Sequence, residues 1–235
     1  MLGIITLILI CFILPLGAVL IAARKSKRSI LIFLAGALSF FISQICIRLP
    51  ILQLVLPNQT WFMKMSLNLW FVIIFYATTA GLFEGIGRQA GLMIACRKHE
   101  ATWLDGVIFG FGHGGCEAIL LVGINGIISY AESGNIISMT LFLASVERLC
   151  AITIHIVTSL LVLYGIKKHT WVYFAAAVGL HAFADGFLLL VNLKTKNIGW
   201  TMFSIVVIMV CYGIGVFLLR SKFEKEEDVL QNSNK

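Results

Sequence analysis

A histidine and a glutamate four residues apart lie in the middle of a long apolar run, Phe109-Gly-Phe-Gly-His113-Gly-Gly-Cys-Glu117. Positions i and i+4 share one face of an α-helix, so the two side chains would point the same way. The surrounding glycines remove bulk from the helix surface, so another helix or an extended substrate could approach closely. Ionisable side chains are costly in hydrocarbon, and the segment therefore predicts part of an active site inside a membrane.

Nine ionisable side chains in all occur inside apolar stretches, and they are Glu84, Arg88, His113, Glu117, Glu147, Arg148, His155, His181 and Asp185. Six of them are acids or arginines. At ~2.5–3.5 kcal/mol each, these six would cost roughly 15–20 kcal/mol if they were left unpaired in lipid. We therefore expect them to face one another or a wet cavity.

Four of these residues share one depth, twelve to fifteen residues from the nearest basic residue at a span end: Glu84, His113, His155 and His181. At a helical rise of 1.5 Å per residue, each would lie ~18–23 Å into the membrane, near the bilayer centre. Glu117 and Glu147 lie somewhat deeper, and Asp185 is one turn beyond His181. Four titratable groups on four helices are thus predicted to meet in one layer.

The composition indicates the elements that must position these residues. Hydrophobic residues make up 60% of the chain and charged residues 12%, against roughly 25% charged in soluble domains. We expect an all-α, polytopic bundle of about seven spans, near 1–23, 29–47, 66–95, 102–124, 136–164, 170–191 and 198–219. The pattern predicts one domain, 1–220, with its catalytic core at about 66–191, followed by a charged cytoplasmic tail, 221–235.

Basic residues are distributed unequally between the two sets of span ends. Eleven lie at one set: Arg24, Lys25, Lys27, Arg28, Arg97, Lys98, Lys167, Lys168, Arg220, Lys222 and Lys225. Four lie at the other: Arg48, Lys64, Lys194 and Lys196. Positive residues favour the cytoplasmic side, so we predict an N-outside, C-inside, multi-pass protein of a cell membrane, bacterial in character. The net charge of +7 reflects this topology and does not indicate a nucleic acid partner.

Three short motifs resemble a known family. Glu84-x-x-x-Arg88, Phe109-x-x-x-His113 and His181-x-x-x-Asp185 resemble the E-x-x-x-R, F-x-x-x-H and H-x-x-x-N/D motifs of the type II CAAX prenyl endopeptidase-like (CPBP/ABI) intramembrane proteases. The chain is most similar to the bacterial YhfC branch, and PrsW-type proteases are related. The resemblance covers residues 66–191. One position departs from the family, because Phe83 stands where the first of two adjacent glutamates is usual.

The resemblance implies hydrolysis of a peptide bond in a membrane protein or membrane-associated peptide, without a cofactor. Glu84 would take a proton from the attacking water, and His113 would hold and polarise that water. His181 and Asp185 would stabilise the oxyanion. Asp185 could do so directly only if protonated, and otherwise would orient His181. Arg88 would orient or neutralise a carboxylate.

Structural roles are the alternatives for each residue. Glu84 and Arg88 could form an i,i+4 ion pair, and the histidines could be hydrogen-bonded packing residues. Glu117 could support the site or neutralise Arg148. Glu147 and Arg148 point about 100° apart on a helix, so we expect them to bridge to other helices and not to pair with each other. His155 is a supporting residue or a packing residue.

Three other functions remain open. In a zinc-dependent protease, His113, Glu117, His155 and His181 would bind the metal, and Glu84 would act on its water. The chain has no H-E-x-x-H motif, so we favour the metal-free mechanism over this alternative. A transporter or proton relay would also use intramembrane acids and histidines. A membrane scaffold of the same fold would need none of the catalytic residues.

Overall fold

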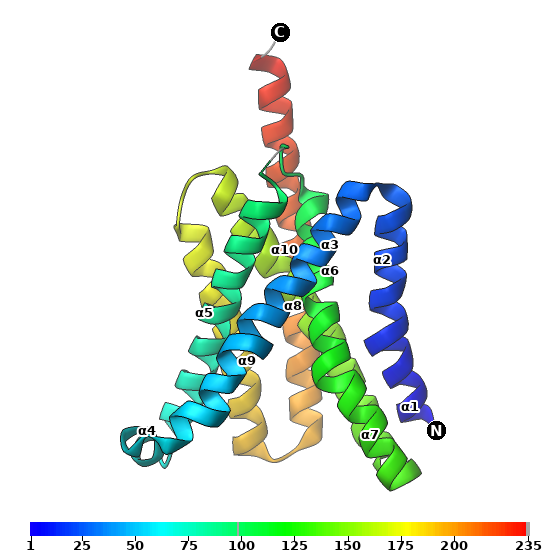
Figure 1. Ribbon diagram of the computed structural model, residues 1–235, viewed down its shortest axis with the longest axis vertical. Helices are drawn as coiled ribbons and strands as arrows, with labels where there is room; N and C mark the ends of the chain where they lie inside the picture. The colour runs from blue at the N-terminus through cyan, green and yellow to red at the C-terminus, as the bar shows by residue number, and fades with distance from the viewer. Residues whose placement is uncertain (98, 234–235) are drawn as a thin grey trace.

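The structure is a computed structural model that describes residues 1–97 and 99–233, with side chains described as far as residue 225. Lys98, counted above among the basic residues, and the side chains of most of the charged tail lie outside this description. The described residues form helices and short connections only (Figure 1). The all-α prediction is therefore confirmed for this part of the chain.

The N-terminal half contains three long passes. The first is built from α1 (Leu2–Leu7), η1 (Ile8–Ile13) and α2 (Leu14–Lys25). The second is built from α3 (Lys27–Phe40), η2 (Phe41–Arg48), η3 (Ile51–Val55) and η4 (Leu56–Asn58). The short helix α4 (Thr60–Met65) then leads to the third pass, α5 (Leu69–Ala95).

The C-terminal half follows the same pattern. One pass joins α6 (Trp103–Glu117), η5 (Ala118–Gly123) and α7 (Ile124–Ser133). A 3₁₀ turn, η6 (Gly134–Ile137), reverses the chain into the long helix α8 (Ser138–Lys167). Two further helices complete the bundle: α9 (Val172–Thr195) and α10 (Ile198–Ser233).

Six stretches are long and apolar enough to cross a membrane, and the longest is Trp103–Lys167, with 65 residues. That stretch reverses direction at Gly134, whose φ of +60° suits glycine, so it crosses twice. The described chain therefore makes seven passes, as the sequence predicts, and its two ends lie at opposite ends of the bundle (Figure 1).

The second pass differs from the prediction, which ended it near Arg48 and Pro50. The helix instead continues through Pro50, at φ −58° and ψ −40°, to Asn58. Proline lacks the N–H that an α-helix needs and its ring crowds the preceding turn. Here wider π-helical turns, η2 before Pro50 and η3 after it, surround the proline, so the chain stays helical.

Glycines allow α6 to contact α3 on one side and α8 on the other. A Cβ added to Gly112 would lie 2.0 Å from the carbonyl oxygen of Phe33 on α3. A Cβ added to Gly110 would lie 2.5 Å from the Cα of Ile156 on α8. The three backbones thus approach to a distance that only glycine permits. This confirms the interpretation of the glycine-rich segment as a place of close helix approach.

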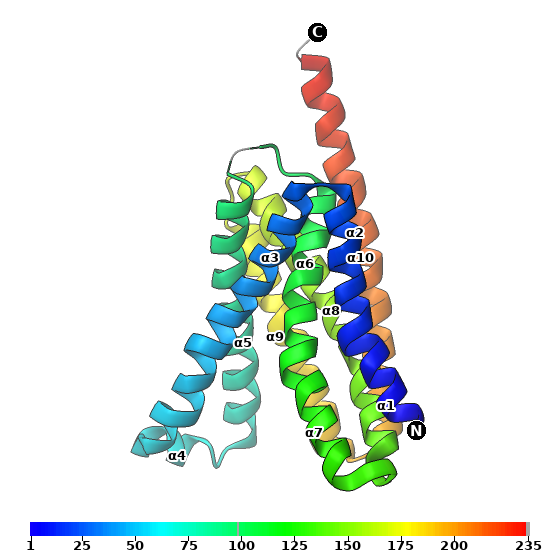
Figure 2. The same cartoon turned by 45° about the vertical axis from the view of Figure 1, so that its right-hand side comes forward.

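Beyond this crossing the second pass separates from α6 and α7. The η2 segment packs on α5, whereas η5 packs on η1 and α7. Figure 2 shows α3–η2 and α6–α7 running apart toward the end of the bundle that carries α4 and α7. Helix α8 lies at the centre and packs on α1, α6, α9 and α10. The predicted polar residues face one another around this central helix.

Candidate active site

A buried carboxylate, Glu84 on α5, forms the centre of a polar cluster. Its Oε2 atom lies 2.7 Å from Arg88 Nη2 and 3.1 Å from His113 Nε2. The same oxygen lies 3.6 Å from His155 Nδ1 and 3.6 Å from His181 Nε2. All five side chains are buried. The structure therefore brings together the four residues that share one depth, from α5, α6, α8 and α9, together with Arg88.

Arg88 Nη2 lies close to Glu84 and to one ring nitrogen of each of the three histidines. Besides Glu84 it contacts His155 Nδ1 at 2.6 Å, His113 Nε2 at 3.2 Å and His181 Nδ1 at 3.5 Å. An Nη atom of arginine has two hydrogens, so it can donate to at most two of these four groups at once. Arg88 Nε, by contrast, is buried without a partner among the described residues. The cluster thus offers more lone pairs than its own donors can serve.

His113 is held from behind by Ser39. The Ser39 hydroxyl lies 2.7 Å from the Gly36 carbonyl oxygen, to which it donates, and 2.8 Å from His113 Nδ1. A hydroxyl has one hydrogen, so its second contact is as an acceptor from Nδ1–H. The neutral ring then carries its free lone pair on Nε2, which faces Glu84 and Arg88.

The other two histidines are held in the same way by carboxylates. His155 Nε2 lies 2.5 Å from Glu117 Oε2, and His181 Nε2 lies 3.3 Å from Asp185 Oδ2. An ionised carboxylate only accepts, so each Nε2 is the protonated nitrogen and each Nδ1 keeps a lone pair. Both Nδ1 atoms face Arg88. Metal-binding histidines are arranged in this way, with the outer nitrogen fixed by a second group.

Glu117, Glu147 and Arg148 form a second polar group beside the first. Arg148 Nη1 lies 2.5 Å from Glu117 Oε1, so Glu117 pairs with Arg148, one of the two roles that the sequence left open, while its other oxygen contacts His155. The prediction that Glu147 and Arg148 would not pair with each other is wrong. Arg148 Nε donates to Glu147 Oε2 at 2.8 Å, and Nη2 donates to Oε1 at 2.5 Å. The Cβ atoms of neighbours diverge on a helix, but these long side chains bend back toward each other.

Besides Ser39, two further residues of the site were not predicted from the sequence. Gln44 Nε2 donates to Glu84 Oε1 at 2.6 Å, and Arg48 Nη1 donates to Gln44 Oε1 at 3.1 Å. Arg48 in turn donates to the Tyr76 carbonyl at 2.7 Å. Arg48 had been counted as a loop residue. Gln44 lies sixteen residues after Arg28, close to the depth of the other four, so the same count would have found it if amides had been included.

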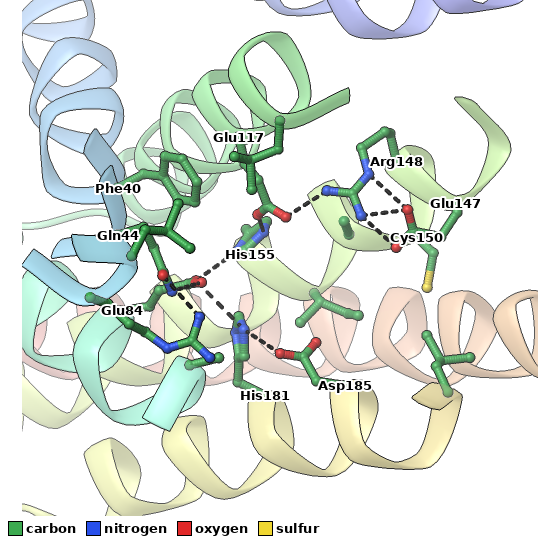
Figure 3. Close-up of a pocket in the computed structure, with 17 residues that line it drawn as sticks. Phe40, Gln44, Glu84, Glu117, Glu147, Arg148, Cys150, His155, His181 and Asp185 are labelled. Carbon is green, nitrogen blue, oxygen red and sulfur yellow. Dashed lines mark hydrogen bonds and ion pairs between the residues drawn. The ribbon is translucent and has the colours of Figure 1, made fainter. Parts of the chain in front are cut away.

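A cavity of about 150 Å³ lies between the two polar groups. Figure 3 shows its labelled walls, with Glu84 and His181 on one side and Arg148 on another. Asp185 also lines it, and the Asp185 side chain is 42% exposed, whereas that of His181 is 4% exposed. The cavity could hold several water molecules at about 30 Å³ each. The polar cluster is therefore accessible from the Asp185 side.

Comparison with known proteins identifies the family of the chain. The family described as YhfC intramembrane metalloprotease matches residues 10–137 and 127–210. The chain belongs to the YhfC family. It is 32% identical over 205 residues to a protein of Bacillus subtilis (strain 168) described as "Uncharacterized membrane protein YhfC", over 74% of this chain and 78% of that protein. No solved structure matches.

The YhfC match confirms part of the predicted identity. The family is described as an intramembrane protease, and the chain is a multi-pass membrane protein with a bacterial relative. The wider relation to CAAX and PrsW-type proteases stays a prediction. The family is described as a metalloprotease, which is compatible with the zinc alternative, and the metal-free mechanism stays a prediction.

The described residues contain a group that could hold a metal ion. Glu84, His113 and His155 each offer one ligand atom, and these atoms lie within 4.8 Å of one another. The zinc alternative names His113, Glu117, His155 and His181 as ligands, so two of its four residues belong to this group, and Glu117 and His181 do not. The structure places Glu117 on the outer side of the His155 ring, where it contacts Nε2 and not the cluster centre.

Proposed function

We propose that this YhfC-family protein is a metal-dependent intramembrane endopeptidase that cleaves a membrane protein or a membrane-associated peptide. One observation supports the proposal most strongly. Three imidazole nitrogens and one carboxylate oxygen converge on a single nitrogen, Arg88 Nη2, which has too few hydrogens to satisfy them. Such an excess of lone pairs in a buried site suits a divalent cation.

The donor set fits Zn²⁺, which takes imidazole nitrogens and carboxylate oxygens in hydrolytic sites. His113, through Nε2, and His155 and His181, through Nδ1, are the residues that would hold it. A zinc ion there would act as a Lewis acid and lower the pKa of a bound water. Ser39, Glu117 and Asp185 would keep the ligand nitrogens unprotonated by binding the outer N–H of each ring.

We assign proton transfer to Glu84. Its Oε2 atom faces all three histidines at 3.1–3.6 Å, whereas its Oε1 atom is occupied by the Gln44 amide. A general base must lie within hydrogen-bond reach of the water that it deprotonates, and Oε2 is the oxygen that faces the proposed ligands. Arg88, one turn away, balances the charge of Glu84 in the membrane interior.

His181 and Asp185 lie at the exposed side of the site, where a substrate would arrive. Asp185 accepts from His181 Nε2 and thereby fixes the orientation of the ring. The cavity continues along η2 and η5, which diverge beyond the α3–α6 crossing. An extended peptide segment is the class of substrate that fits this narrow, partly polar space.

The metal content of variants tests the assignment. Protein purified in mild detergent and dialysed against chelator would be given Zn²⁺, and bound metal would be measured by mass spectrometry. We expect about one ion per chain in the wild type and in Glu84→Gln, and little in His113→Ala or His155→Ala. His169→Asn is the matched control, because His169 lies in an exposed turn at φ +51°, which asparagine tolerates.

Each alternative has a distinct result. Loss of metal in Glu84→Gln would make Glu84 a ligand and not the base. A wild type without metal, but active, would support the metal-free mechanism. Activity would be measured by membrane proteomics. Substrates should accumulate uncleaved in cells that express Glu84→Gln or His113→Ala in place of the wild type. Unchanged processing in both variants would instead support a non-catalytic scaffold.

A further inference from the structure

A second, larger cavity lies far from the candidate active site, at the basic end of the bundle. It measures about 530 Å³ and lies between the α2–α3 turn, the start of α6 and α10. Its charged lining is Lys25, Arg28, Asp105, Arg220 and Glu224, and its aromatic lining is Trp103 and Phe223. The charged residues are three cations and two anions. The cavity therefore has an excess of one positive charge.

The pairing of these residues shows where that charge lies. Arg28 forms an ion pair with Asp105, and Arg220 Nε lies 2.7 Å from Glu224 Oε1. The Arg220 guanidinium also lies over the Trp103 ring, 5.5 Å from its centre. Lys25 forms no ion pair with any residue that the structure describes. The uncompensated charge is thus on Lys25, at the end of α2.

An apolar groove adjoins this cavity. It measures about 510 Å³, runs between α2 and α6, and shares Lys25 and Leu104 with the polar cavity. Pro15 of α2 contacts α6 at Gly115, where an added Cβ would lie 2.9 Å from Pro15 Cβ. Two residues nearer to Lys25, an added Cβ on Gly17 would meet nothing within 4 Å. The groove is therefore open where α2 stands away from α6.

The dimensions of the two spaces match a lipid in one leaflet. From Lys25 to Ile13, at the inner end of the groove, the helix rises about 18 Å. Half of a bilayer's hydrocarbon thickness is about 15 Å. Trp103, beside the polar cavity, is a residue type enriched at the membrane surface. The polar cavity thus lies at headgroup level, and the groove lies at acyl-chain level.

We propose that this composite site binds an anionic phospholipid, with its phosphate beside Lys25 and one acyl chain along the α2–α6 groove. Basic pockets between membrane helices are suited to anionic headgroups, and a zwitterionic lipid would gain less from the excess charge. The opening at Gly17 provides space for the chain without movement of either helix. The site is independent of the proposed hydrolytic chemistry.

Lipid retention tests the proposal. The full chain would be reconstituted in nanodiscs containing equal amounts of phosphatidylglycerol and phosphatidylcholine, extracted in mild detergent and weighed with its bound lipids by native mass spectrometry. We expect preferential retention of phosphatidylglycerol. Lys25→Gln should lower this retention about fivefold, whereas Lys27→Gln, an exposed lysine on the same turn, should leave it unchanged.

A second pair of variants tests the acyl-chain part of the site. Gly17→Leu fills the groove and should abolish retention of phosphatidylglycerol. Gly213→Leu on α10 is the matched control, because an added Cβ there also meets nothing within 4 Å. Bound metal should be the same in all four variants, which separates failure of this proposal from failure of the proposed function.

Four results would overturn the proposal. Equal retention of phosphatidylglycerol and phosphatidylcholine would show that headgroup charge has no effect on binding. Equal retention of phosphatidylglycerol by Lys25→Gln and Lys27→Gln would show that Lys25 does not bind the headgroup. An effect of Lys25→Gln with none of Gly17→Leu would indicate a headgroup or free-phosphate site without a lipid chain. A change of oligomer mass in Gly17→Leu, with lipid retention unaltered, would show that a second copy of the chain covers the groove.

Discussion

The three histidines of the site differ in what holds their outer nitrogen. His113 is bound to a serine hydroxyl, His155 to a carboxylate that is itself paired with an arginine, and His181 to a half-exposed aspartate. A carboxylate partner raises the basicity of an imidazole more than a hydroxyl does. His155 should therefore be a stronger metal ligand than His113. The tautomer of His113 is fixed only by the Ser39 hydroxyl, so metal binding by His113 should depend most on that partner.

Removal of the Ser39 hydroxyl should weaken metal binding without touching a ligand. In Ser39→Ala, His113 Nδ1–H loses its acceptor, so the ring can rotate or change tautomer. Loss of such a partner lowers metal affinity about 10–100-fold. A chelator competition titration with Zn²⁺ would measure it.

Ser43→Ala is the control for this variant, because Ser43 is also buried on the second pass but bonds only the Phe40 carbonyl, at 3.4 Å. An equal loss of affinity in the two variants would mean that Ser39 acts through packing and not through His113.

Gln44 should affect catalysis more than substrate binding. Its amide holds Glu84 Oε1 at 2.6 Å and so determines which oxygen faces the histidines. A hydrogen bond to a charged group is worth about 1.5–3 kcal/mol, so Gln44→Ala should lower kcat about 10–100-fold and change KM little. Cleavage of a substrate identified by membrane proteomics would provide the assay.

Gln53→Ala, at an exposed position on η3, should behave as wild type in that assay. A Gln44→Ala effect confined to KM would place Gln44 in substrate binding instead.

The sequence predicts the acids and histidines of this site better than their partners. Ionisable residues are costly in lipid, so those inside apolar spans stand out in the sequence. Counting residues from the nearest basic span end then places Glu84 and the three histidines at one depth. Ser39 and Gln44 are uncharged, and their positions at the site follow only from the way α3 and η2 lie against α5 and α6. The Glu147–Arg148 pair depends on side-chain rotamers, which helix periodicity does not determine.

At the level of helices, the α3–α6 crossing sets the distances within the site. Gly36 and Gly112 allow α3 and α6 to meet backbone to backbone. This contact places Ser39, one turn after Gly36, against His113, one residue after Gly112. A separation of the two helices by the width of a methyl group would break the Ser39–His113 contact.

Gly112→Ala should therefore destabilise the bundle and weaken the site together. The new Cβ would lie 2.0 Å from the Phe33 carbonyl oxygen, which belongs to backbone and cannot turn away. Overpacking of this kind costs about 1–3 kcal/mol, so thermal unfolding in detergent should occur at a lower temperature and Zn²⁺ affinity should fall.

Gly213→Ala, with open space at its Cβ, should change neither quantity. A Gly112→Ala protein with unchanged unfolding temperature and metal affinity would contradict the backbone contact.

Hydropathy and charge predict the helices well, but not where each one ends. Seven passes follow from the spacing of apolar runs and basic residues, and the structure contains them. The second pass was predicted to end near Pro50, because an α-helix cannot accommodate an internal proline without distortion. The π-helical turns on both sides of Pro50 are a local solution that no periodicity rule anticipates.

For the whole molecule, the two ends of the bundle have different characters. One end holds the α2–α3 turn and the start of α6, with the basic residues Lys25 and Arg28. The cavity of the candidate active site extends toward the other end, past Arg48 and Leu121. If the basic end faces the cytoplasm, a substrate reaches the cluster from the outer half of the membrane.

Labelling of single cysteines would determine this orientation. In a variant whose six native cysteines are replaced, Glu132→Cys at the exposed end of α7 and Arg97→Cys at the basic end would each be introduced. By sequence, eleven basic residues flank one set of span ends, and the other set keeps three, Lys64, Lys194 and Lys196, once Arg48 is placed at the site; this favours a cytoplasmic basic end. A membrane-impermeant maleimide should therefore label Glu132→Cys in intact cells and Arg97→Cys only after lysis. The reverse pattern would invert the bundle, and access to Glu84 would then be from the cytoplasmic half.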